Sequence, residues 1–308
     1  MTFLYQSDPV RGAAWARRFA SHAPDVSFRM WPDVGNPFAV RYLAAWKLPE
    51  DFTTRFPNLE VLFSVGAGVD QLDLSRVPDS IPVVRMIEPG LVAGMVEYAA
   101  LAVLAAHRDW PAYLAQQRRG EWKALPVHPA ATRRVGVMGL GVMGRAMLAK
   151  LRGFGFPCAG WSRSARALDG VECFDGPSAL PAFLARTEIL VCVLPLTNET
   201  RGILDRRLFD ALPRGAALVN MGRGAHLAAT DLLAALDDGR IRAAILDVAD
   251  PEPLPADHPL WRHPGVILTP HIAAETQPET AADAVIENIR RHRRGETLVG
   301  LVDRRRGY

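Results

Sequence analysis

Three ionisable side chains in the second half of the sequence are of the types that proton transfer and anion binding require. Arg223, Glu252 and His271 each come a few residues after an apolar run typical of a strand. In an open parallel sheet, ligands bind outside the carboxyl ends of the strands, where these side chains can converge. A histidine exchanges protons near neutral pH, a carboxylate beside it stabilises its charged form, and a guanidinium binds carboxylates. Each residue alone also has an ordinary explanation as a loop or surface residue, so the spacing leaves a catalytic set open.

A glycine-rich segment, Gly139-Leu140-Gly141-Val142-Met143-Gly144, follows the apolar run 135–138 and precedes a helical pattern. The first glycine allows a tight turn, the second lets the backbone approach a pyrophosphate, and the third lets the helix pack against the strand. The start of the helix then offers N–H groups to the phosphates. An ordinary glycine-rich turn is the alternative, but four further strand–helix units follow, and they favour a dinucleotide site.

The residues after the next strand decide which dinucleotide is expected. A site that prefers NAD usually has an Asp or Glu about 20 residues after the glycine motif, where it binds the ribose 2′-hydroxyl. Ser162, Arg163 and Ser164 occupy this place, and the nearest acid is Asp169. Arg163 and Arg166 offer guanidinium groups to a 2′-phosphate, and the serines offer hydroxyls. We therefore predict a preference for NADP over NAD; two surface arginines in a loop are the alternative.

The elements that must position these residues form two strand–helix series. The first has strands at 2–5, 39–46, 61–65 and 83–86 with a helix at 11–20, and a helical stretch at 95–119, interrupted by Pro111, follows it. The second has strands at 135–138, 158–161, 189–194, 217–220, 243–248 and 266–268, with a helix from an N-cap at Thr230 to Gly239 and a last helix at 279–291. Near-continuous apolar runs are typical of parallel strands covered on both faces. The sequence therefore predicts an α/β fold with two doubly wound, Rossmann-like domains and a cleft between them.

Composition excludes several other classes of protein. The 308 residues are 49% apolar and 22% charged, and the net charge is +3, as in ordinary globular proteins. The basic clusters lack the interleaved aromatics of a nucleic-acid surface, and the longest membrane-like run, 98–106, is half of what a bilayer needs. Cys158, Cys173 and Cys192 lack metal spacing and indicate buried thiols in a reducing compartment. We expect no metal, no nucleic-acid or membrane partner, and a cytoplasmic protein without a signal-type segment.

Several longer segments resemble one family. They are VNMGRGAHL at 219–227, ILDV at 245–248 with PEPLP at 251–255, HPLW at 258–261, TPHIAA at 269–274 and VDRRRGY at 302–308. Over nearly its whole length the sequence resembles the D-isomer-specific 2-hydroxyacid dehydrogenases, and more closely the glyoxylate/hydroxypyruvate reductase A subgroup. Ala249 departs from the pattern, because the family usually has an aromatic residue there.

The resemblance implies roles for particular residues. His271 would be the general acid and base, Glu252 its partner, and Arg223 the anchor of the substrate. The turn at 64–70, with Ala67 and Gly68, would bind the substrate carboxylate through backbone N–H groups in an anion nest. Trp46 would wall the pocket, although a core tryptophan is an equal alternative, and His226 would lie behind Arg223 at most.

The resemblance also implies the contacts of the cofactor and the organisation of the chain. The expected cofactor contacts are Gly139, Leu140, Gly141, Val142, Met143, Gly144, Ser162, Arg163, Ser164, Arg166, Leu194, Pro195, Leu196, Thr200, Met221, Gly222, Asp247 and Ala273. Residues 1–97 with 275–308 would form the substrate domain, residues 98–274 the NADP domain, and the long helix after Met95 a homodimer contact. The expected reaction is NADPH-dependent reduction of glyoxylate or hydroxypyruvate. A reductase of a bulkier 2-keto acid and a nucleotide-sensing scaffold without activity are the alternatives.

Overall fold

The computed structural model describes residues 1–307 and divides the chain into two compact units. The first unit is Met1–Leu91 together with the residues from Glu275 onward, and the second is Val92–Ala274. The division falls in the first turn of α3 (Pro89–His107), whereas the sequence placed it at residue 97, further along the same helix. Each unit is an α/β fold with one parallel sheet, so the predicted fold class is confirmed.

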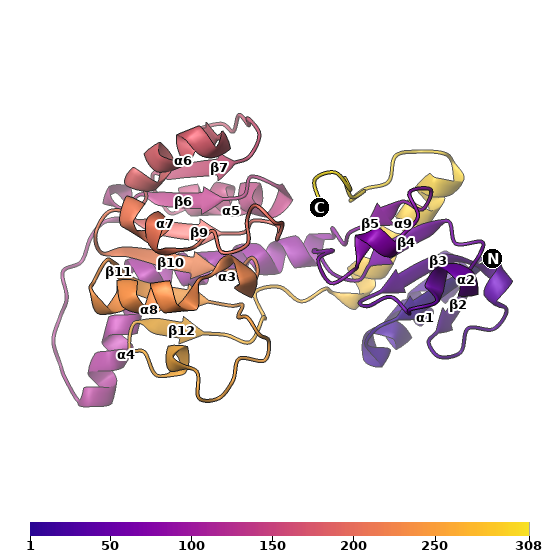
Figure 1. The fold of residues 1–308 in the computed structure, drawn as a ribbon, viewed down its shortest axis with the longest axis horizontal. Coiled ribbons are helices and arrows are strands. Elements are labelled where there is room, and N and C mark those ends of the chain that lie inside the picture. The colour runs from indigo at the N-terminus through magenta and orange to yellow at the C-terminus, as the bar shows by residue number, and fades with distance from the viewer. Residues whose placement is uncertain (308) are drawn as a thin grey trace. The chain divides into compact units, whose positions relative to one another are not determined.

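The second unit is built on a sheet of seven parallel strands (Figure 1). They are β6 (Val135–Met138), β7 (Cys158–Ser162), β8 (Glu172–Asp175), β9 (Ile189–Cys192), β10 (Ala216–Asn220), β11 (Ile241–Leu246) and β12 (Val266–Leu268). Their order across the sheet is β12-β11-β10-β9-β6-β7-β8. Consecutive strands run outward in opposite directions from the β6–β9 pair, and dinucleotides bind at such a switch point in open sheets.

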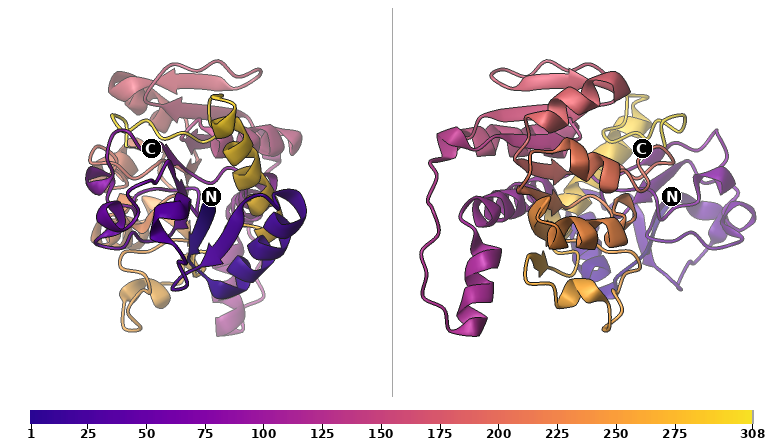
Figure 2. Two further views of the ribbon diagram at one scale, coloured as in Figure 1. Left: turned by 90° about the vertical axis from the view of Figure 1, so that its right-hand side faces the viewer. Right: turned by 60° about the vertical axis from the view of Figure 1, so that its left-hand side comes forward.

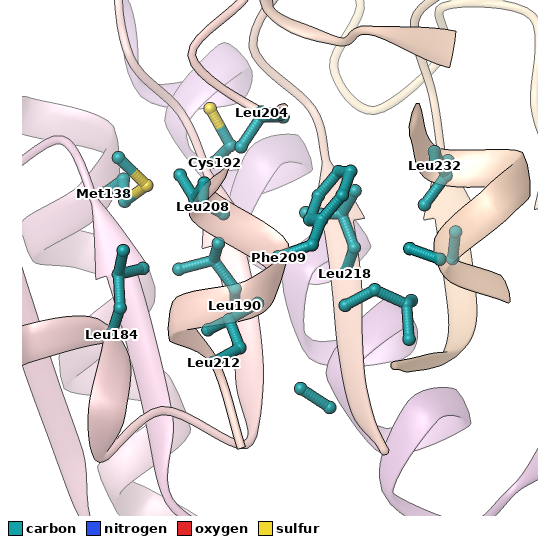
Figure 3. Close-up of a cluster of buried hydrophobic side chains, with 14 of the residues drawn as sticks. Met138, Leu184, Leu190, Cys192, Leu204, Leu208, Phe209, Leu212, Leu218 and Leu232 are labelled. Carbon is teal, nitrogen blue, oxygen red and sulfur yellow. The ribbon is translucent and has the colours of Figure 1, made fainter. Parts of the chain in front are cut away.

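Helices cover both faces of this sheet. Buried side chains of α3 and of α5 (Val142–Gly153) pack on one face. The other face carries α6 (Gly176–Ala185), α7 (Arg206–Ala211) and α8 (Ala229–Asp237). Figure 3 shows this second layer, where Leu208 and Phe209 of α7 lie over Leu190 and Leu218 of the strands. Burying one such side chain stabilises the fold by about 1.5–3 kcal/mol, which is why the strands are continuously apolar in sequence.

Two elements of this unit differ from the sequence prediction. The strand β8 was not foreseen, because its residues at this edge of the sheet are half-buried or exposed and lack an apolar run. The helix α8 begins at Ala229 after Ala228, so the predicted N-cap at Thr230 is wrong. Apolar periodicity located this helix, but Thr230 lies one residue inside it.

The predicted helical stretch 95–119 is two helices. α3 ends at His107, Asp109 adopts a left-handed conformation with φ of 56°, and α4 (Trp110–Arg119) begins with Pro111 in its first turn, where a missing N–H is harmless. Within residues 1–307, α3 is the one helix long and apolar enough to cross a membrane by length and composition, so the expected nine-residue run was too short. Its buried face nevertheless packs against the sheet of this unit. In Figure 2, the extended segment after α4 stands away from the sheet.

The first unit has a smaller sheet with the order β2-β1-β3-β4-β5. Its strands are β1 (Thr2–Gln6), β2 (Ser27–Met30), β3 (Val40–Ala45), β4 (Val61–Ser64) and β5 (Val83–Val84), and its helices are α1 (Pro9–His22), α2 (Phe52–Arg55) and α9 (Pro278–Arg293). The chain returns through α9, which is fastened to α1 by an ion pair between Arg18 and Asp283 of 2.6 Å. The strand order turns between β1 and β3, so Trp46 follows a strand at the switch point of this sheet.

Candidate functional site

The structure joins two of the three predicted catalytic residues by a hydrogen bond. His271 lies just after β12, and its Nδ1 is 2.8 Å from Oε2 of Glu252. The other carboxylate oxygen of Glu252 accepts the N–H of Ala249 at 3.0 Å, which fixes the carboxylate. Both side chains are 40% exposed, so the pair is open to solvent and to small molecules. With Nδ1 bound to the carboxylate, Nε2 is the nitrogen that can exchange a proton with a ligand.

The backbone of His271 has an uncommon conformation that the neighbouring strand holds in place. Its φ is 55°, in the left-handed region that costs a non-glycine residue energy. The N–H of His271 donates to the carbonyl of Asp247 at 2.7 Å. The Asp247 carboxylate, which is buried, accepts the N–H groups of Ile272 at 2.9 Å and Ala273 at 2.8 Å. Asp247 therefore fixes the segment that carries His271.

A hydroxyl chain extends this network toward α3. Thr269 donates its hydroxyl to the Asp247 carboxylate at 2.7 Å, and the hydroxyl of Tyr98 lies 2.5 Å from that of Thr269. Burial raises the pKa of Tyr98 to about 12, so its hydroxyl keeps its proton at neutral pH. Sequence reasoning expected Asp247 to contact a cofactor and missed its bracing role. Its position at the end of an apolar strand, where a buried carboxylate needs hydrogen-bond partners, was the available signal.

Arg223 lies after β10, and its peptide groups are held by two fully buried side chains. Its N–H donates to Nδ1 of His226 at 3.0 Å, and its carbonyl accepts from Nδ2 of Asn220 at 3.1 Å. Its guanidinium Nη1 donates to the carbonyl of Gly222 at 2.9 Å. The strands β10, β11 and β12 are neighbours in the sheet, so Arg223, Glu252 and His271 all follow the carboxyl ends of adjacent strands.

The glycine motif has the geometry that a pyrophosphate requires. Gly139 has φ of 109°, and a side chain on Gly144 would come 1.8 Å from the Gly139 carbonyl oxygen, so only glycine lets α5 start this close to β6. A side chain on Gly141 would meet open space. The helix begins at Val142 without a side-chain cap, which leaves its first N–H groups to a ligand. Leu140 is buried and Met143 is half-buried. The segment therefore fits a dinucleotide.

The loop after β7 presents the predicted arginines, and the segment after β9 adds an acid that the sequence did not reveal. Arg163 and Arg166 are exposed, and Ser162 donates its hydroxyl to the Ser164 carbonyl at 2.8 Å. The pKa of Glu199 is lowered by a hydrogen bond from the Thr197 hydroxyl, by its own backbone N–H and, to a smaller extent, by the charge of Arg163. Glu199 thus lies within the electrostatic field of Arg163, although the two residues are far apart in sequence.

The other predicted cofactor contacts lie in the segments after β9, β10 and β12. After β9, the Thr200 hydroxyl donates to the Pro195 carbonyl at 2.7 Å and accepts the N–H of Thr197 at 2.8 Å, which closes the turn. The remaining ones are buried or half-buried: Leu194, Leu196, Met221, Gly222 and Ala273. Their contact with a cofactor stays a prediction.

The first unit holds the other predicted substrate residues. The buried hydroxyl of Ser64 donates to the carbonyls of Gly66 at 3.0 Å and Gly68 at 2.7 Å. The N–H groups of Ala67 and Gly68 donate to no group within residues 1–307, so they can receive an anion. Neither these two residues nor Gly66 has a positive φ, so the turn lacks αR–αL alternation, and binding of a carboxylate by its N–H groups stays a prediction.

Trp46 is not a core residue. Its side chain is 43% exposed, and its six-membered ring lies so close to Gly66 that a Cβ there would be 3.1 Å away. The alternative of a core tryptophan is therefore wrong. The exposed ring beside the turn is placed to limit what can approach the backbone of that turn.

The three cysteines lie in the second unit, and Sγ of Cys192 is 4.0 Å from Nδ1 of His226. Burial raises the pKa of Cys158 to about 11 and that of Cys192 to about 12, so both remain thiols. Cys173 is only half-buried, which corrects the expectation that all three are buried. Among residues 1–307, no group of three or more His, Cys, Asp or Glu side chains is arranged to hold a metal ion.

Comparison with known proteins agrees with this geometry. Residues 100–273 match the family model of the D-isomer specific 2-hydroxyacid dehydrogenase, NAD binding domain. A glyoxylate/hydroxypyruvate reductase A from Yersinia enterocolitica is 40% identical over the whole of both chains. A D-isomer specific 2-hydroxyacid dehydrogenase from Xanthobacter autotrophicus, solved with NADPH and MES, has a TM-score of 0.94 at 42% identity and 99% coverage of both chains. An NADPH-dependent glyoxylate/hydroxypyruvate reductase from Sinorhizobium meliloti, solved with NADP and sulfate, has a TM-score of 0.91 at 36% identity, covering 100% of this chain and 99% of the other.

Proposed function

Because the chain belongs to the D-isomer-specific 2-hydroxyacid dehydrogenases, in the glyoxylate/hydroxypyruvate reductase A subgroup, we propose that it reduces glyoxylate to glycolate and hydroxypyruvate to D-glycerate with NADPH. It is an NAD(P)-dependent oxidoreductase, as the resemblance in its sequence predicted. The observation that carries the proposal is the 2.8 Å bond between His271 and Glu252 beside the strand that presents Arg223.

His271 is the proton donor in this proposal. Reduction of a keto group requires a proton on the carbonyl oxygen, and a general acid within hydrogen-bond reach typically contributes ~10²–10⁴-fold to the rate. Glu252 binds Nδ1 and stabilises the protonated ring by its charge, which leaves Nε2–H to give the proton. The network of Asp247 keeps the ring at the edge of the sheet during turnover.

Arg223 is the anchor of the substrate. A planar guanidinium binds a carboxylate in bidentate fashion and also stabilises negative charge that develops on a neighbouring keto oxygen. Ala67 and Gly68 of the first unit offer two backbone N–H groups to the substrate carboxylate, and Trp46 restricts the size of the acid. These assignments favour 2-keto acids with a small third substituent.

The glycine motif and the loops after β7 and β9 hold the cofactor in this proposal. Bound NADPH supplies the hydride. The open space at Gly141 and the uncapped start of α5 suit the pyrophosphate, and Arg163 with Arg166 suits the 2′-phosphate. Two similar structures contain NADPH or NADP, which supports a preference for NADP(H) over NAD(H).

We further propose a cytoplasmic homodimer that forms through α3, α4 and the segment that follows. Large apolar side chains on this part of the second unit face solvent: Leu101, Trp110, Tyr113, Trp122 and Val127. Trp122 is fully exposed, which is uncommon for a tryptophan in a monomer. A second copy of this chain would cover these side chains.

Steady-state kinetics with a panel of acids test this function. Glyoxylate and hydroxypyruvate should give the highest kcat/KM with NADPH, while phenylpyruvate should be poor. A higher kcat/KM for phenylpyruvate would favour the bulkier-acid reductase. Binding of NADPH without turnover of any acid would favour the non-enzymatic scaffold.

A further inference from the structure

His226 is a fully buried histidine whose hydrogen bonds determine its tautomer. Its Nδ1 accepts the N–H of Arg223 at 3.0 Å, so that nitrogen carries no proton. Its Nε2 lies 3.3 Å from the carbonyl oxygen of Pro195, an acceptor, so Nε2 carries the hydrogen. The ring is therefore neutral and links the segment after β10 to the turn after β9.

The chain around His226 is shaped to hold this ring. A side chain on Gly222 would come 3.0 Å from two atoms of the imidazole, and one on Gly224 would come 1.9 Å from the carbonyl oxygen of Ala249. Glycine on both sides of Arg223 therefore lets the segment pack closely against the ring and against the segment after β11. The backbone of His226 is also held, because Leu204 donates its N–H to the carbonyl of His226 at 2.9 Å.

We propose that His226 is a positioning residue that, together with Asn220, fixes the backbone of Arg223 and thereby aims its guanidinium at the substrate. His226 binds the N–H of Arg223 and Asn220 binds its carbonyl, so both peptide groups of the substrate anchor are bound by buried side chains. The bond to Pro195 couples this placement to the turn in which cofactor contacts are proposed. The inference rests on the proposed role of Arg223.

Three substitutions separate the bond of the ring to Arg223 from its bond to Pro195. His226→Asn places an amide oxygen near the position of Nδ1 and keeps an acceptor for Arg223. His226→Gln places its amide near the position of Nε2, keeps the donor to Pro195 and leaves the Arg223 N–H without its acceptor. His226→Leu removes both bonds. Asn and Gln are polar and of similar size, so each is a matched control for the other.

The expected result is a split between kinetic constants. Because small misplacements of a binding group cost on the order of 10²-fold, His226→Leu and His226→Gln should lower kcat/KM for glyoxylate by about 10- to 100-fold, mainly through KM. His226→Asn should stay within about threefold of the parent. The Kd of oxalate, measured with NADP⁺ bound, should follow the same order. Equal losses in the Asn and Gln variants, or wild-type KM in the Gln variant, would overturn the proposal. If the Leu variant does not fold, the Asn and Gln pair decides.

A spectroscopic measurement is independent of turnover. The ¹⁵N resonances of the imidazole of His226, assigned by their loss in His226→Asn, should show an unprotonated Nδ1 and a protonated Nε2 at neutral pH. A proton on Nδ1 would contradict the inference even in an active enzyme. If the parent protein reduces no 2-keto acid while the tautomer is as predicted, the proposed function fails and the bond to Arg223 stands.

Discussion

The carboxyl edges of the two sheets are built in different ways. In the second unit, the residues proposed to act on the substrate are charged side chains, and buried polar groups of Asn220, His226 and Asp247 hold the backbone that carries them. In the first unit, the proposed ligands are backbone N–H groups of a short turn, braced by Ser64, with the exposed ring of Trp46 beside them.

The two edges therefore differ in how strictly the positions of their functional groups are fixed. Buried polar groups cost free energy unless every partner is present, so three of them beneath one edge indicate that position matters there. A turn whose backbone is itself the ligand needs little more than one hydroxyl to keep its shape. We therefore expect changes in the second unit to lower the turnover or the binding of every 2-keto acid, and changes in the first unit to alter the size of the acid that is accepted.

The largest effect should come from His271. His271→Ala removes the proton donor and should lower kcat by ~10²–10⁴-fold while NADPH affinity changes little. Glu252→Gln, which keeps the hydrogen bond geometry but removes the charge, should cost less. The rate of single-turnover oxidation of bound NADPH by glyoxylate, measured for the two variants and the parent, checks both losses. A His271→Ala enzyme with the parent's rate would exclude this residue from the mechanism.

A substitution at Asp247 tests the hydrogen bonds that hold the backbone around His271, and it leaves the side chains of His271 and Glu252 unchanged. In Asp247→Asn an NH₂ group replaces one of the two acceptor oxygens. It then faces either the Ala273 N–H, or the Ile272 N–H and the Thr269 hydroxyl, all of which are donors. We expect a loss of about 1–3 kcal/mol in the free energy of unfolding and a fall in kcat of up to about 10²-fold. Denaturant titration and kinetics on the same variant check the two values. An unchanged kcat in the destabilised protein would make Asp247 purely structural.

Arg223→Lys keeps the charge and removes the planar fork. A charge-assisted hydrogen bond contributes roughly 1.5–3 kcal/mol, so kcat/KM for glyoxylate should fall by about 10- to 150-fold. The Kd of NADPH, measured by fluorescence, should hardly change. Equal losses for glyoxylate and NADPH would instead indicate that Arg223 binds the cofactor.

Cofactor choice should respond in opposite directions to two substitutions. Arg163→Ala should weaken the binding of NADPH by about tenfold and leave the binding of NADH nearly unchanged. The expected loss is no larger because the loop is exposed and its charged contacts are screened by salt. Glu199→Gln removes a negative charge near Arg163 and should strengthen the binding of NADPH by about two- to fivefold. Kinetics with both cofactors check this. A parent enzyme that already favours NADH would contradict the interpretation of this loop.

A substitution at Trp46 should give the smallest change, and it should raise kcat/KM for one acid instead of lowering it. Trp46→Ala opens space beside Gly66, so kcat/KM for phenylpyruvate should rise by about fivefold while that for glyoxylate falls slightly. Trp46→Phe is the control, because it keeps an aromatic ring. No change in the ratio of the two acids would show that Trp46 does not border the substrate.

The sequence predicted most of the fold because the physics that forms it is local. Continuous apolar runs located the buried strands, and the glycine motif located the start of α5. The strands β2 and β8 were missed because their partly exposed residues show no such run. The break between α3 and α4 was placed at Pro111 instead of the left-handed Asp109, since sequence shows the residue type and not its backbone conformation.

The sequence predicted only the part of the site that depends on residue type and on position along the chain. Residue types and strand ends suggested Arg223, Glu252 and His271, but the braces and the approach of Glu199 to Arg163 depend on which loops meet in space. Residues such as Tyr98 and Thr269 lie 171 positions apart and carry no motif that joins them. Only the tertiary structure brings these side chains together.

The function proposed for this chain is transfer of a hydride from NADPH to a small 2-keto acid, with the D-hydroxy acid as the product. The most direct measurement is the amount and chirality of glycerate formed from hydroxypyruvate against the amount of NADPH consumed. We expect equal amounts of NADPH oxidised and D-glycerate formed. L-glycerate as the product, or NADPH consumption that does not depend on hydroxypyruvate, would contradict it.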